Sequence, residues 1–462
     1  MANASHDLTK GSIPAHFRAL AVPTAIGMVF TTLYNVVDVY FAGLISTDAQ
    51  AGLAISFQTF FILIALGFGL SSGMSALVGN SLGEGATDDA RRIAGQGIGY
   101  GIIASVLVGV LGYFFAPYLI ALISEPGSYR DAANAYLRWL LFATMSFLLA
   151  FGANGILTAQ GDTVSMQRAQ IVAFFANLIL NPLFIFGIPG VVSGIGFNGI
   201  ALSTIVSQTG VLVYILRQVL RSDMMVGEPI DLRPNLPDYK AITGQALPAS
   251  FAMIVMMIGG FVVQFFLKGF GGEAIAAYGV ALRIEQLLLL PAFGITGALL
   301  PIAAQNYGAK NFDRVREAAY FCAKSGVALM LVASVILWVA ARPAMRIFTD
   351  DPDVIRIGAS YLNVDGFILP FYVMLFGINS LLQAFKKPMM TLWIGLYRQG
   401  IGIALFVSIY VLVFDIGVWG VWFGIATAVI TGFFFAVWLT ERVAKDLIGG
   451  MRGSTLVTHH AK

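Results

Sequence analysis

The strongest constraint on this chain is a series of twelve long apolar runs, separated by charged clusters and by glycine or proline residues. At 1.5 Å per residue, a helix built on each run is long enough to cross a hydrocarbon layer about 30 Å thick. With 58% hydrophobic and 11% charged residues, the chain has too little polar surface to fold as a soluble globule. The sequence therefore predicts an all-α membrane protein with twelve transmembrane helices, at 16–43, 51–78, 91–117, 131–159, 165–187, 195–220, 240–269, 276–304, 315–340, 356–385, 390–413 and 418–442.

Positive charge is divided unequally between alternate loops. If the N-terminus is cytoplasmic, the inside loops, span ends and tails carry about 18 of the 27 Lys and Arg residues. The opposite orientation would invert the positive-inside rule, so both termini are predicted to be cytoplasmic. The apolar run after Arg18 is too long for the core of a signal peptide, so no cleaved targeting segment is expected.

An internal repeat divides the twelve helices into two groups of six. A polar, proline-rich segment lies between the sixth and seventh runs, and the offset that separates Pro23 from Pro248 aligns the two sides. The positions aligned by this repeat offset are Ala21-Val-Pro23 with Ala246-Leu-Pro248, Gly69 with Gly294, Gly83 with Gly308, and Asn154 with Asn379. Because six spans return the chain to the same side, the halves are expected to be parallel repeats with the substrate path between them. The predicted organisation is an N-terminal lobe at 1–221, a linker at 222–239, a C-terminal lobe at 240–446 and a tail at 447–462.

One carboxylate, Asp38, interrupts the first apolar run. An acid at membrane depth costs about 2.5–3.5 kcal/mol unless it is protonated, paired or facing water. In helical steps of three and four, Asp38 shares a face with Thr31, Tyr34 and Asn35, which predicts a polar stripe facing protein or a cavity. The alternative is a neutral acid that serves packing alone. Pro23, fifteen residues upstream (38 − 23), removes a backbone donor and predicts a bend in the same helix.

Two asparagines of the fifth run, Asn177 and Asn181, are candidates for donors to this acid. They lie four residues apart and therefore share one helical face. Purely structural hydrogen bonds between helices would produce the same pattern. The repeat offset relates the acid and the two amides to Val263, Gly402 and Phe406, so the polar site is predicted for the N-terminal lobe only.

Other charged residues within the runs have less defined roles. Arg283 and Glu285 are two residues apart and cannot share a helical face, so each needs a partner elsewhere or lines a cavity. Asp365 is expected to face an outer vestibule or to cap backbone groups. Arg283, Lys324 and Arg398 lie about two turns from span ends, where long side chains reach the interface. The single cysteine, Cys322, excludes an intramolecular disulfide and a cysteine metal cluster.

Several short motifs, in this order along the whole chain, resemble the multidrug and toxic compound extrusion (MATE) transporters. They are Tyr34-Asn-Val-Val-Asp38 with Phe41-Ala-Gly43, Gly79-Asn-Ser-Leu-Gly83 before Ala90-Arg-Arg92, Asn154-Gly-Ile-Leu-Thr-Ala-Gln-Gly-Asp162 and Gln305-Asn-Tyr-Gly308. The chain is most similar to the DinF-like branch, which keeps its cation-coupling carboxylate at the position of Asp38. The resemblance implies a bend at Pro23. It also implies a group of residues around the acid, namely Tyr34, Tyr136, Asn154, Asn177, Asn181 and, by a looser correspondence, Thr204. Asn35, Tyr34 and Tyr136 are expected in the substrate cavity.

Two departures from the family bear on the coupling ion. The other bacterial branch has acids in its seventh and tenth spans, but Met253–Met257 and Phe371–Phe376 contain none, so a sodium site in the C-terminal lobe is not expected. Some DinF-like members have a second acid where this chain has Asn181. A site with one carboxylate and two amides is better suited to binding a proton than to binding sodium. Sodium coupling remains the alternative.

The resulting functional prediction is a multidrug antiporter of the bacterial inner membrane. It would export small amphipathic compounds, cationic or neutral, in exchange for protons, by alternating access, as a monomer without a cofactor. The alternatives are a sodium-coupled exporter and a flippase for lipid-linked precursors. An intramembrane enzyme is not expected, because the HExxH motif and paired Gly-x-Gly-Asp acids are absent and no serine has a histidine to serve it. The net charge of +3 gives no indication of nucleic-acid binding.

Overall fold

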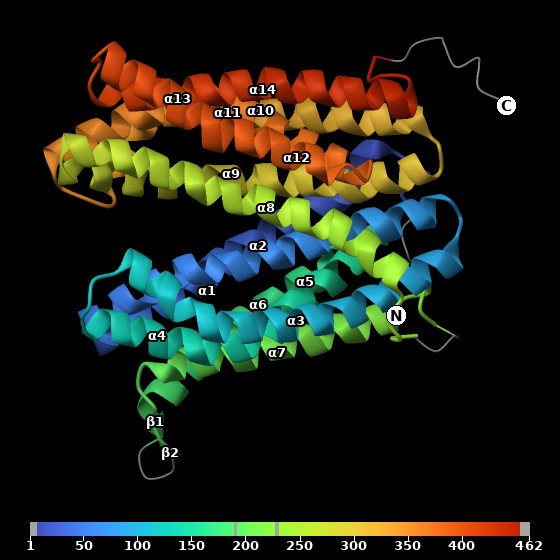
Figure 1. Cartoon of the computed structure of the whole chain (residues 1–462), viewed down its shortest axis with the longest axis horizontal. Coiled ribbons are helices and arrows are strands. Elements are labelled where there is room, and N and C mark those ends of the chain that lie inside the picture. Colours follow the sequence, from blue (N-terminus) through green and yellow to red (C-terminus); the bar gives the residue numbers. More distant parts are fainter. Residues whose placement is uncertain (1–6, 189–191, 227–230, 453–462) are drawn as a thin grey trace. The chain divides into compact units, whose positions relative to one another are not determined.

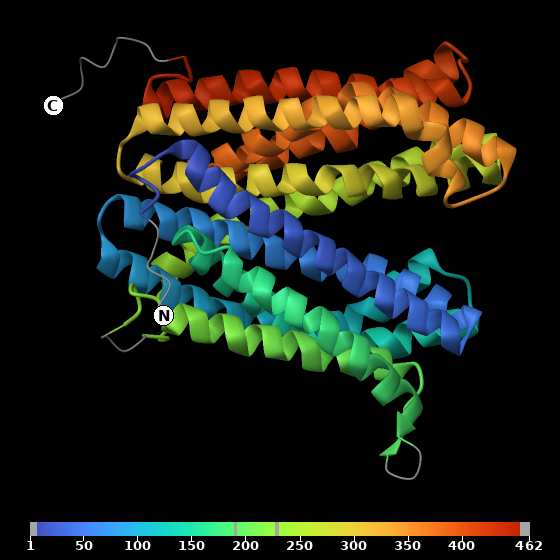
Figure 2. The same cartoon turned by 180° about the vertical axis from the view of Figure 1, so that it is seen from behind.

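Within the described residues, twelve helical spans are long and apolar enough to cross a membrane, and Figures 1 and 2 show their arrangement. The computed structural model describes residues 7–188, 192–226 and 231–452, so part of the predicted linker and most of the predicted tail lie outside the described residues. The spans are formed by α1 (Ile13–Ile45), α2 (Thr47–Gly83), α3 (Thr87–Ile123), α4 (Ser128–Leu140) with α5 (Thr144–Ala159), α6 (Val164–Phe186), α7 (Asn198–Leu220), α8 (Leu236–Leu267), α9 (Gly272–Gly308), α10 (Phe312–Arg346), α11 (Pro352–Ala384), α12 (Pro388–Gly395) with α13 (Ile403–Ser408), and α14 (Val418–Ile448). The predicted all-α membrane fold with twelve spans is confirmed.

Most spans are longer than predicted, because the charged clusters that were used to place their ends are themselves helical. Arg91 and Arg92 lie inside α3, which begins at Thr87, and Arg314 lies inside α10, which begins at Phe312. A helix can continue beyond the hydrocarbon layer into the headgroup region, where charged side chains are solvated. Hydropathy therefore gives the number of spans more reliably than their ends.

Three of the described spans are not α-helical throughout, and the seventh span ends in a 3₁₀ turn at Lys268–Phe270. The fourth has a 3₁₀ turn at Leu141–Ala143 between α4 and α5. The eleventh has π-helical segments at Leu396–Gly402 and Ile409–Val413, on either side of α13. A short antiparallel hairpin, β1 (Gly187–Ile188) with β2 (Val192–Ser193), connects α6 to α7 and lies below the helices in both views (Figures 1 and 2).

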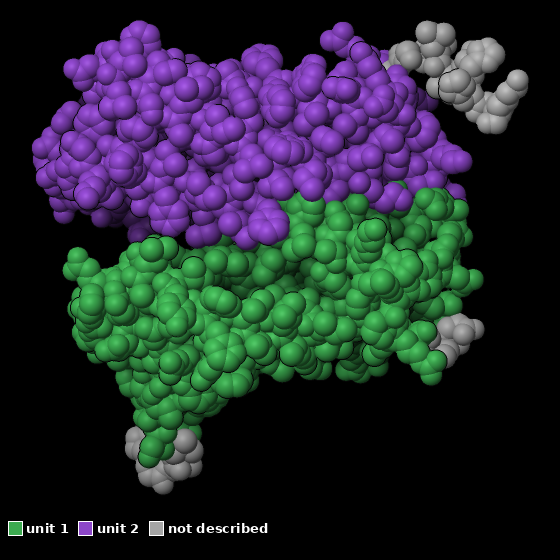
Figure 3. Space-filling view, viewed as in Figure 1, with its two compact units in different colours: residues 1–7, 26–250 green, residues 8–25, 251–462 purple. Residues whose placement is uncertain are grey.

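The chain forms two compact units, coloured separately in Figure 3. The first is built on residues 26–250, and the second on residues 8–25 and the described residues from 251 onward. In the first unit α2 packs against α3, α4 and α5; in the second α9 packs against α10 and α11. Both α1 and α8 are thus divided between units, at points two residues after Pro23 and Pro248. Each unit therefore contains the beginning of a helix whose remainder belongs to the other.

Glycines of the repeat allow these helix beginnings to pack closely. A Cβ atom at Gly69 of α2 would lie 2.8 Å from Ser250 N of α8. Its equivalent in the repeat, Gly294 of α9, would place a Cβ atom 2.7 Å from Ala21 O of α1. In each unit, a repeated glycine therefore contacts the proline-containing helix beginning that packs in the same unit. The repeat offset relates the two glycines to each other, and it also relates the two proline-containing segments. The lobe bounds predicted from the sequence, 1–221 and 240–446, differ from the bounds of these packing units and remain a prediction.

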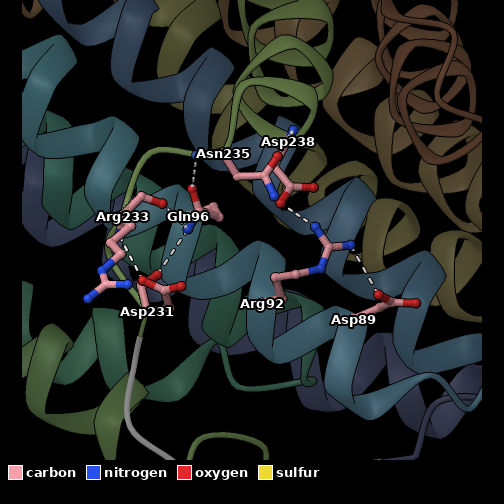
Figure 4. A network of polar contacts seen from close by, with 7 residues as sticks. All are labelled: Asp89, Arg92, Gln96, Asp231, Arg233, Asn235 and Asp238. Carbon is pink, nitrogen blue, oxygen red and sulfur yellow. Dashed lines mark hydrogen bonds and ion pairs between the residues drawn. The ribbon is translucent and has the colours of Figure 1, made fainter.

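The segment before α8 is fixed to α3 of the first unit (Figure 4). The Gln96 side chain donates to two carbonyls of segment 231–235, at 3.0 and 2.9 Å, and accepts from the Asn235 N–H at 2.9 Å. Arg92 forms an ion pair with Asp238 in the first turn of α8. These contacts attach the described end of the predicted linker to the first unit.

The segment before α1 is held in the same manner in the second unit. Leu8 N donates to Gln305 Oε1 at 2.9 Å, and Leu8 O accepts from Asn306 Nδ2 at 3.0 Å. Arg314 donates to Gly11 O at 2.9 Å. The two helix beginnings are thus anchored by side chains of the unit in which they pack.

A further correspondence appears where the last helix of each half ends. Arg91 Nε donates to Met224 O at 2.7 Å, just after α7, and Arg316 Nε donates to Gly450 O at 2.9 Å, just after α14. The two arginines are related by the repeat offset, and each also pairs with the aspartate three residues before it. The repeat therefore extends to individual side-chain contacts.

Candidate functional site

Asp38 lies in the part of α1 that belongs to the first unit, and its side chain is only 2% exposed. Its Oδ1 atom accepts from Asn181 Nδ2 at 2.8 Å and from Asn177 Nδ2 at 3.1 Å. Its Oδ2 atom accepts from Thr204 Oγ1 at 3.4 Å. The structure thus brings together one carboxylate and three neutral donors from α1, α6 and α7.

The two amides are themselves connected. Asn181 Nδ2 also donates to Asn177 Oδ1 at 3.1 Å, and Asn177 Nδ2 also donates to Ser203 Oγ at 3.2 Å. Each amide nitrogen therefore uses both of its hydrogens and is held in one orientation. Ser203 was missed in the sequence analysis, although it directly precedes Thr204. Its place beside Thr204, in a helix that also carries Ser207 and Gln208, was the available signal.

The electrostatic consequence concerns the charge of Asp38. Since all three donors are neutral, the carboxylate charge is hydrogen-bonded but not balanced by a positive side chain among these contacts. A buried charge without a counter-charge is costly in a medium of low dielectric constant. A proton or a small cation can neutralise this site.

A cavity of about 120 Å³ in the first unit adjoins the acid. Tyr34, Asn35 and Tyr136, which were expected in the substrate cavity, line it together with Asp38 and Thr204. The rest of the lining is mainly aromatic and apolar. Thr31 belongs to the polar stripe predicted from the sequence, whereas Gln170 and Gln208 were not predicted. These remaining lining residues are Thr31, Phe57, Phe60, Ile64, Leu140, Phe147, Ala150, Phe151, Met166, Gln170 and Gln208.

Asn154 is placed differently from the other predicted residues. It lies on α5, and in the described part of the chain it neither bonds to Asp38 nor lines this cavity. Its Oδ1 atom is buried without a hydrogen-bond partner among the described residues, and so is Oδ1 of Asn379, its equivalent in the repeat. The shared environment favours a role common to both halves over one specific to the acid.

Pro23 lies within a continuous α1, so the hinge expected there remains a prediction. Proline has no N–H with which to bond the carbonyl one turn upstream. Thr24 Oγ1 donates to Leu20 O at 2.8 Å and so satisfies a neighbouring carbonyl of the same turn.

The second unit contains a separate cluster of buried charged residues. Glu285 Oε2 accepts from Tyr361 OH at 2.6 Å. Asp365 is 0% exposed, and neither of its oxygens has a hydrogen-bond partner within the described residues. The Arg398 guanidinium lies 5.6 Å from the centre of the Tyr372 ring and is also buried.

These positions correct two expectations from the sequence. Asp365 does not face a vestibule or cap backbone groups, and Arg398 does not extend to the interface. The π-helical segment that contains Arg398 changes the angle at which successive side chains project, so distance from a span end gave the wrong environment. In the described part of the chain, no group of three or more His, Cys, Asp or Glu residues is arranged to hold a metal ion.

Comparison with known families gives a match to the same family model in each half of the chain. The family model MatE matches residues 23–183 and again 248–409. The two matches begin at Pro23 and Pro248, the pair of residues that defines the offset of the internal repeat. The repeat predicted from the sequence is thereby confirmed.

Among curated proteins, the chain is 26% identical over 401 residues to an FAD transporter of Shewanella oneidensis, covering 85% of this chain and 87% of that protein. It is 24% identical over 358 residues to the multidrug export protein MepA of Staphylococcus saprophyticus, covering 77% and 78%. Among solved structures, a MOP superfamily transporter from Pyrococcus furiosus has a TM-score of 0.89 at 22% identity, covering 98% of this chain and 100% of that chain. The outward-facing structure of a multidrug resistance MATE family transporter has a TM-score of 0.87 at 23% identity, covering 96% and 100%. At these identities, the structural matches establish the fold.

Proposed function

This chain belongs to the MatE family of membrane transporters, and from that premise we propose that it exports small amphipathic compounds in exchange for protons that bind Asp38. The family consists of transporters and not of enzymes. Multidrug export by relatives such as MepA supports organic drugs and dyes as the transported compounds. The proposed setting is the bacterial inner membrane, with both termini cytoplasmic.

The observation that carries the choice of a proton is the environment of Asp38. The carboxylate is buried beside a cavity, and three neutral groups donate to it. Protonation removes its charge without requiring new ligands. The same event weakens the acceptor that orients Asn177 and Asn181, because a protonated carboxyl group is a weaker acceptor than a carboxylate.

The proposed cycle follows from this change. In the outward-open state, Asp38 takes up a proton from the acidic side of the membrane. The weaker hydrogen bonds to α6 and α7 then allow α1 to bend at Pro23, which narrows the cavity and displaces the bound compound. After the transporter turns inward, the proton leaves to the cytoplasm and Asp38 recovers its three donors.

Sodium is the second candidate ion, and one observation favours it. Asn181 Oδ1 is buried without a hydrogen-bond partner among the described residues, close to a carboxylate that the same side chain contacts. Carboxylate, amide and hydroxyl oxygens are suitable ligands for hard cations. A sodium site would use Asp38, Asn177, Asn181 and Thr204.

The cavity does not favour a flippase for lipid-linked diphosphates. Its lining, within the described residues, includes neither Lys nor Arg. Recognition of a diphosphate normally uses such side chains, because their charged hydrogen bonds to phosphate oxygens are strong. The aromatic lining is suited to flat, greasy compounds.

Transport into inverted membrane vesicles tests the proposal. Dye accumulation should follow an imposed pH difference at constant sodium and should not respond to a sodium gradient at constant pH. Accumulation that follows the sodium gradient alone would replace the proton by sodium. A lack of dye transport under both gradients would contradict multidrug export itself.

A further inference from the structure

A groove in the first unit lies on a face that the proposed cycle does not use. It runs between α3 and the α4–α5 span and has a volume of about 360 Å³, within the range of about 300–1,000 Å³ that is typical of small-molecule sites. Of the described spans, α3 buries the smallest share of its most apolar stretch within the protein. The groove therefore faces the lipid.

The walls of the groove are almost entirely apolar. On α3, Val106, Val110 and Phe114 follow one another at intervals of four residues and are exposed. Phe142, on the opposite wall, is 79% exposed. Among the described lining residues, the aliphatic hydroxyl groups are satisfied within their own chain segments, because Ser105 donates to Gly101 O and Thr144 donates to Leu141 O. Such walls are suited to contact with the hydrocarbon chains of lipids.

Two local features keep the groove open. The fourth span changes from α-helix to a 3₁₀ turn at Leu141–Ala143, which makes up part of one wall. On the facing helix, Gly109 has no side chain, and a Cβ atom there would meet only ordinary contacts, the nearest being Thr144 Cβ at 3.8 Å. A larger side chain at Gly109 would thus enter the groove without a backbone clash.

Arg138 is the cation among the described residues that line the groove. It is exposed, and its guanidinium lies 6.0 Å from the centre of the Tyr113 ring. Within the described part of the chain it forms no ion pair with a carboxylate. Trp139 follows it and is also exposed, as is usual for aromatic residues where hydrocarbon meets headgroups. At the headgroup level, a planar guanidinium without a carboxylate partner is well suited to two phosphate oxygens.

We propose that this groove binds a phospholipid, with an acyl chain along α3 between Val106 and Phe114 and the phosphate on Arg138. The combination of an apolar channel and one unpaired guanidinium matches the two chemical parts of such a lipid. Free phosphate lacks the chain, and a neutral diacylglycerol lacks the anion. The site is separate from the Asp38 cavity, with which it shares no described lining residue.

Photolabelling of the purified protein in lipid nanodiscs tests the proposal. The probe is a phosphatidylglycerol with a diazirine in one acyl chain, and labelled peptides are located by mass spectrometry. We expect labelling within 105–114 and 141–145, with no competition from free inorganic phosphate. A diacylglycerol with the same diazirine chain should label these peptides about tenfold less, as the loss of a charge-assisted hydrogen-bonded pair implies.

Two variants address the two parts of the site, with one matched control. Arg138→Gln should reduce labelling about tenfold by removing the phosphate partner, and Gly109→Leu should reduce it by filling the channel. Arg442→Gln is the control, because Arg442 is another exposed arginine beside an aromatic ring, at 5.9 Å from the centre of Trp438, but lies outside the groove. Labelling that is equal in wild type and Arg138→Gln, or equal for the phosphate-free probe, would overturn the phosphate contact. Labelling unaffected by Gly109→Leu would overturn the chain position.

Discussion

Each unit buries at least one carboxylate within its membrane spans, but the groups that surround these carboxylates differ between the units. In the first unit, Asp38 has three neutral donors and a cavity beside it. In the second, Glu285 has one tyrosine donor, Asp365 has none among the described residues, and a buried Arg398 is present in the same unit. The packing contacts of the two units follow the repeat offset, whereas these polar sites do not. The two halves therefore share their helix packing, but they do not share the buried polar groups that could bind ions.

The comparison predicts its largest effect at Asp38. Asp38→Asn should lose at least about nine-tenths of proton-driven dye export, because an amide neither ionises nor takes up a proton near neutral pH. The measurement is dye export from cells at matched protein level. Asp365→Asn, the corresponding change to a buried aspartate of the second unit, should retain most of its export. Equal losses in both variants would remove the distinction between the two sites.

Substitution of either repeated glycine, Gly69 or Gly294, should lower the stability of the protein by a similar amount. Gly69→Ala and Gly294→Ala each place a Cβ atom against the backbone of a helix beginning. The resulting overpacking should cost about 1–3 kcal/mol of stability, measured as a lower thermal unfolding temperature in detergent. Gly297→Ala is the control, since a Cβ atom there would meet none of the described atoms within 4 Å. A large loss at one repeated glycine and none at the other would show that the helix beginnings are packed differently.

The hydroxyl of Tyr361 tests the cluster of the second unit. Tyr361→Phe leaves Glu285 buried without its hydrogen-bond donor, which should cost about 1–2 kcal/mol of stability. Export per folded molecule, corrected for protein level, should change little, because the cluster is outside the proposed cycle. Normal stability combined with defective export would give this cluster a role in transport.

The smallest effect is expected at the prolines. Pro23→Ala restores a backbone hydrogen bond and favours a straight α1, so export should fall about threefold, equivalent to about 0.7 kcal/mol, while dye binding is retained. Pro248→Ala is the control, because α8 has Val263 at the position equivalent to Asp38. If Pro248→Ala lost as much export as Pro23→Ala or more, the effect of the proline would not depend on protonation of Asp38.

Local sequence patterns were sufficient for part of this arrangement. Apolar run length predicted the twelve spans, and an offset common to several positions predicted the repeat. The four-residue spacing of Asn177 and Asn181 indicated donors on one face, and the structure places both against Asp38.

Other features depend on contacts between distant segments or on irregular backbone. Nothing in the sequence near residue 25 or 250 shows that α1 and α8 are divided between the packing units. The aromatic lining of the cavity comes from several helices, and its phenylalanines resemble those that face lipid. Arg398 lies in a π-helical segment, where side chains do not project at the angles of a regular α-helix, so its distance from a span end did not show that it is buried.

The most direct test of the central claim is the number of protons released when dye binds to the purified protein in weakly buffered detergent solution. If the proton and the compound compete through Asp38, wild type should release up to about one proton per dye bound, and Asp38→Asn should bind dye without release. Dye binding without proton release by wild type, or equal release by Asp38→Asn, would contradict the assignment of Asp38 as the proton-binding group.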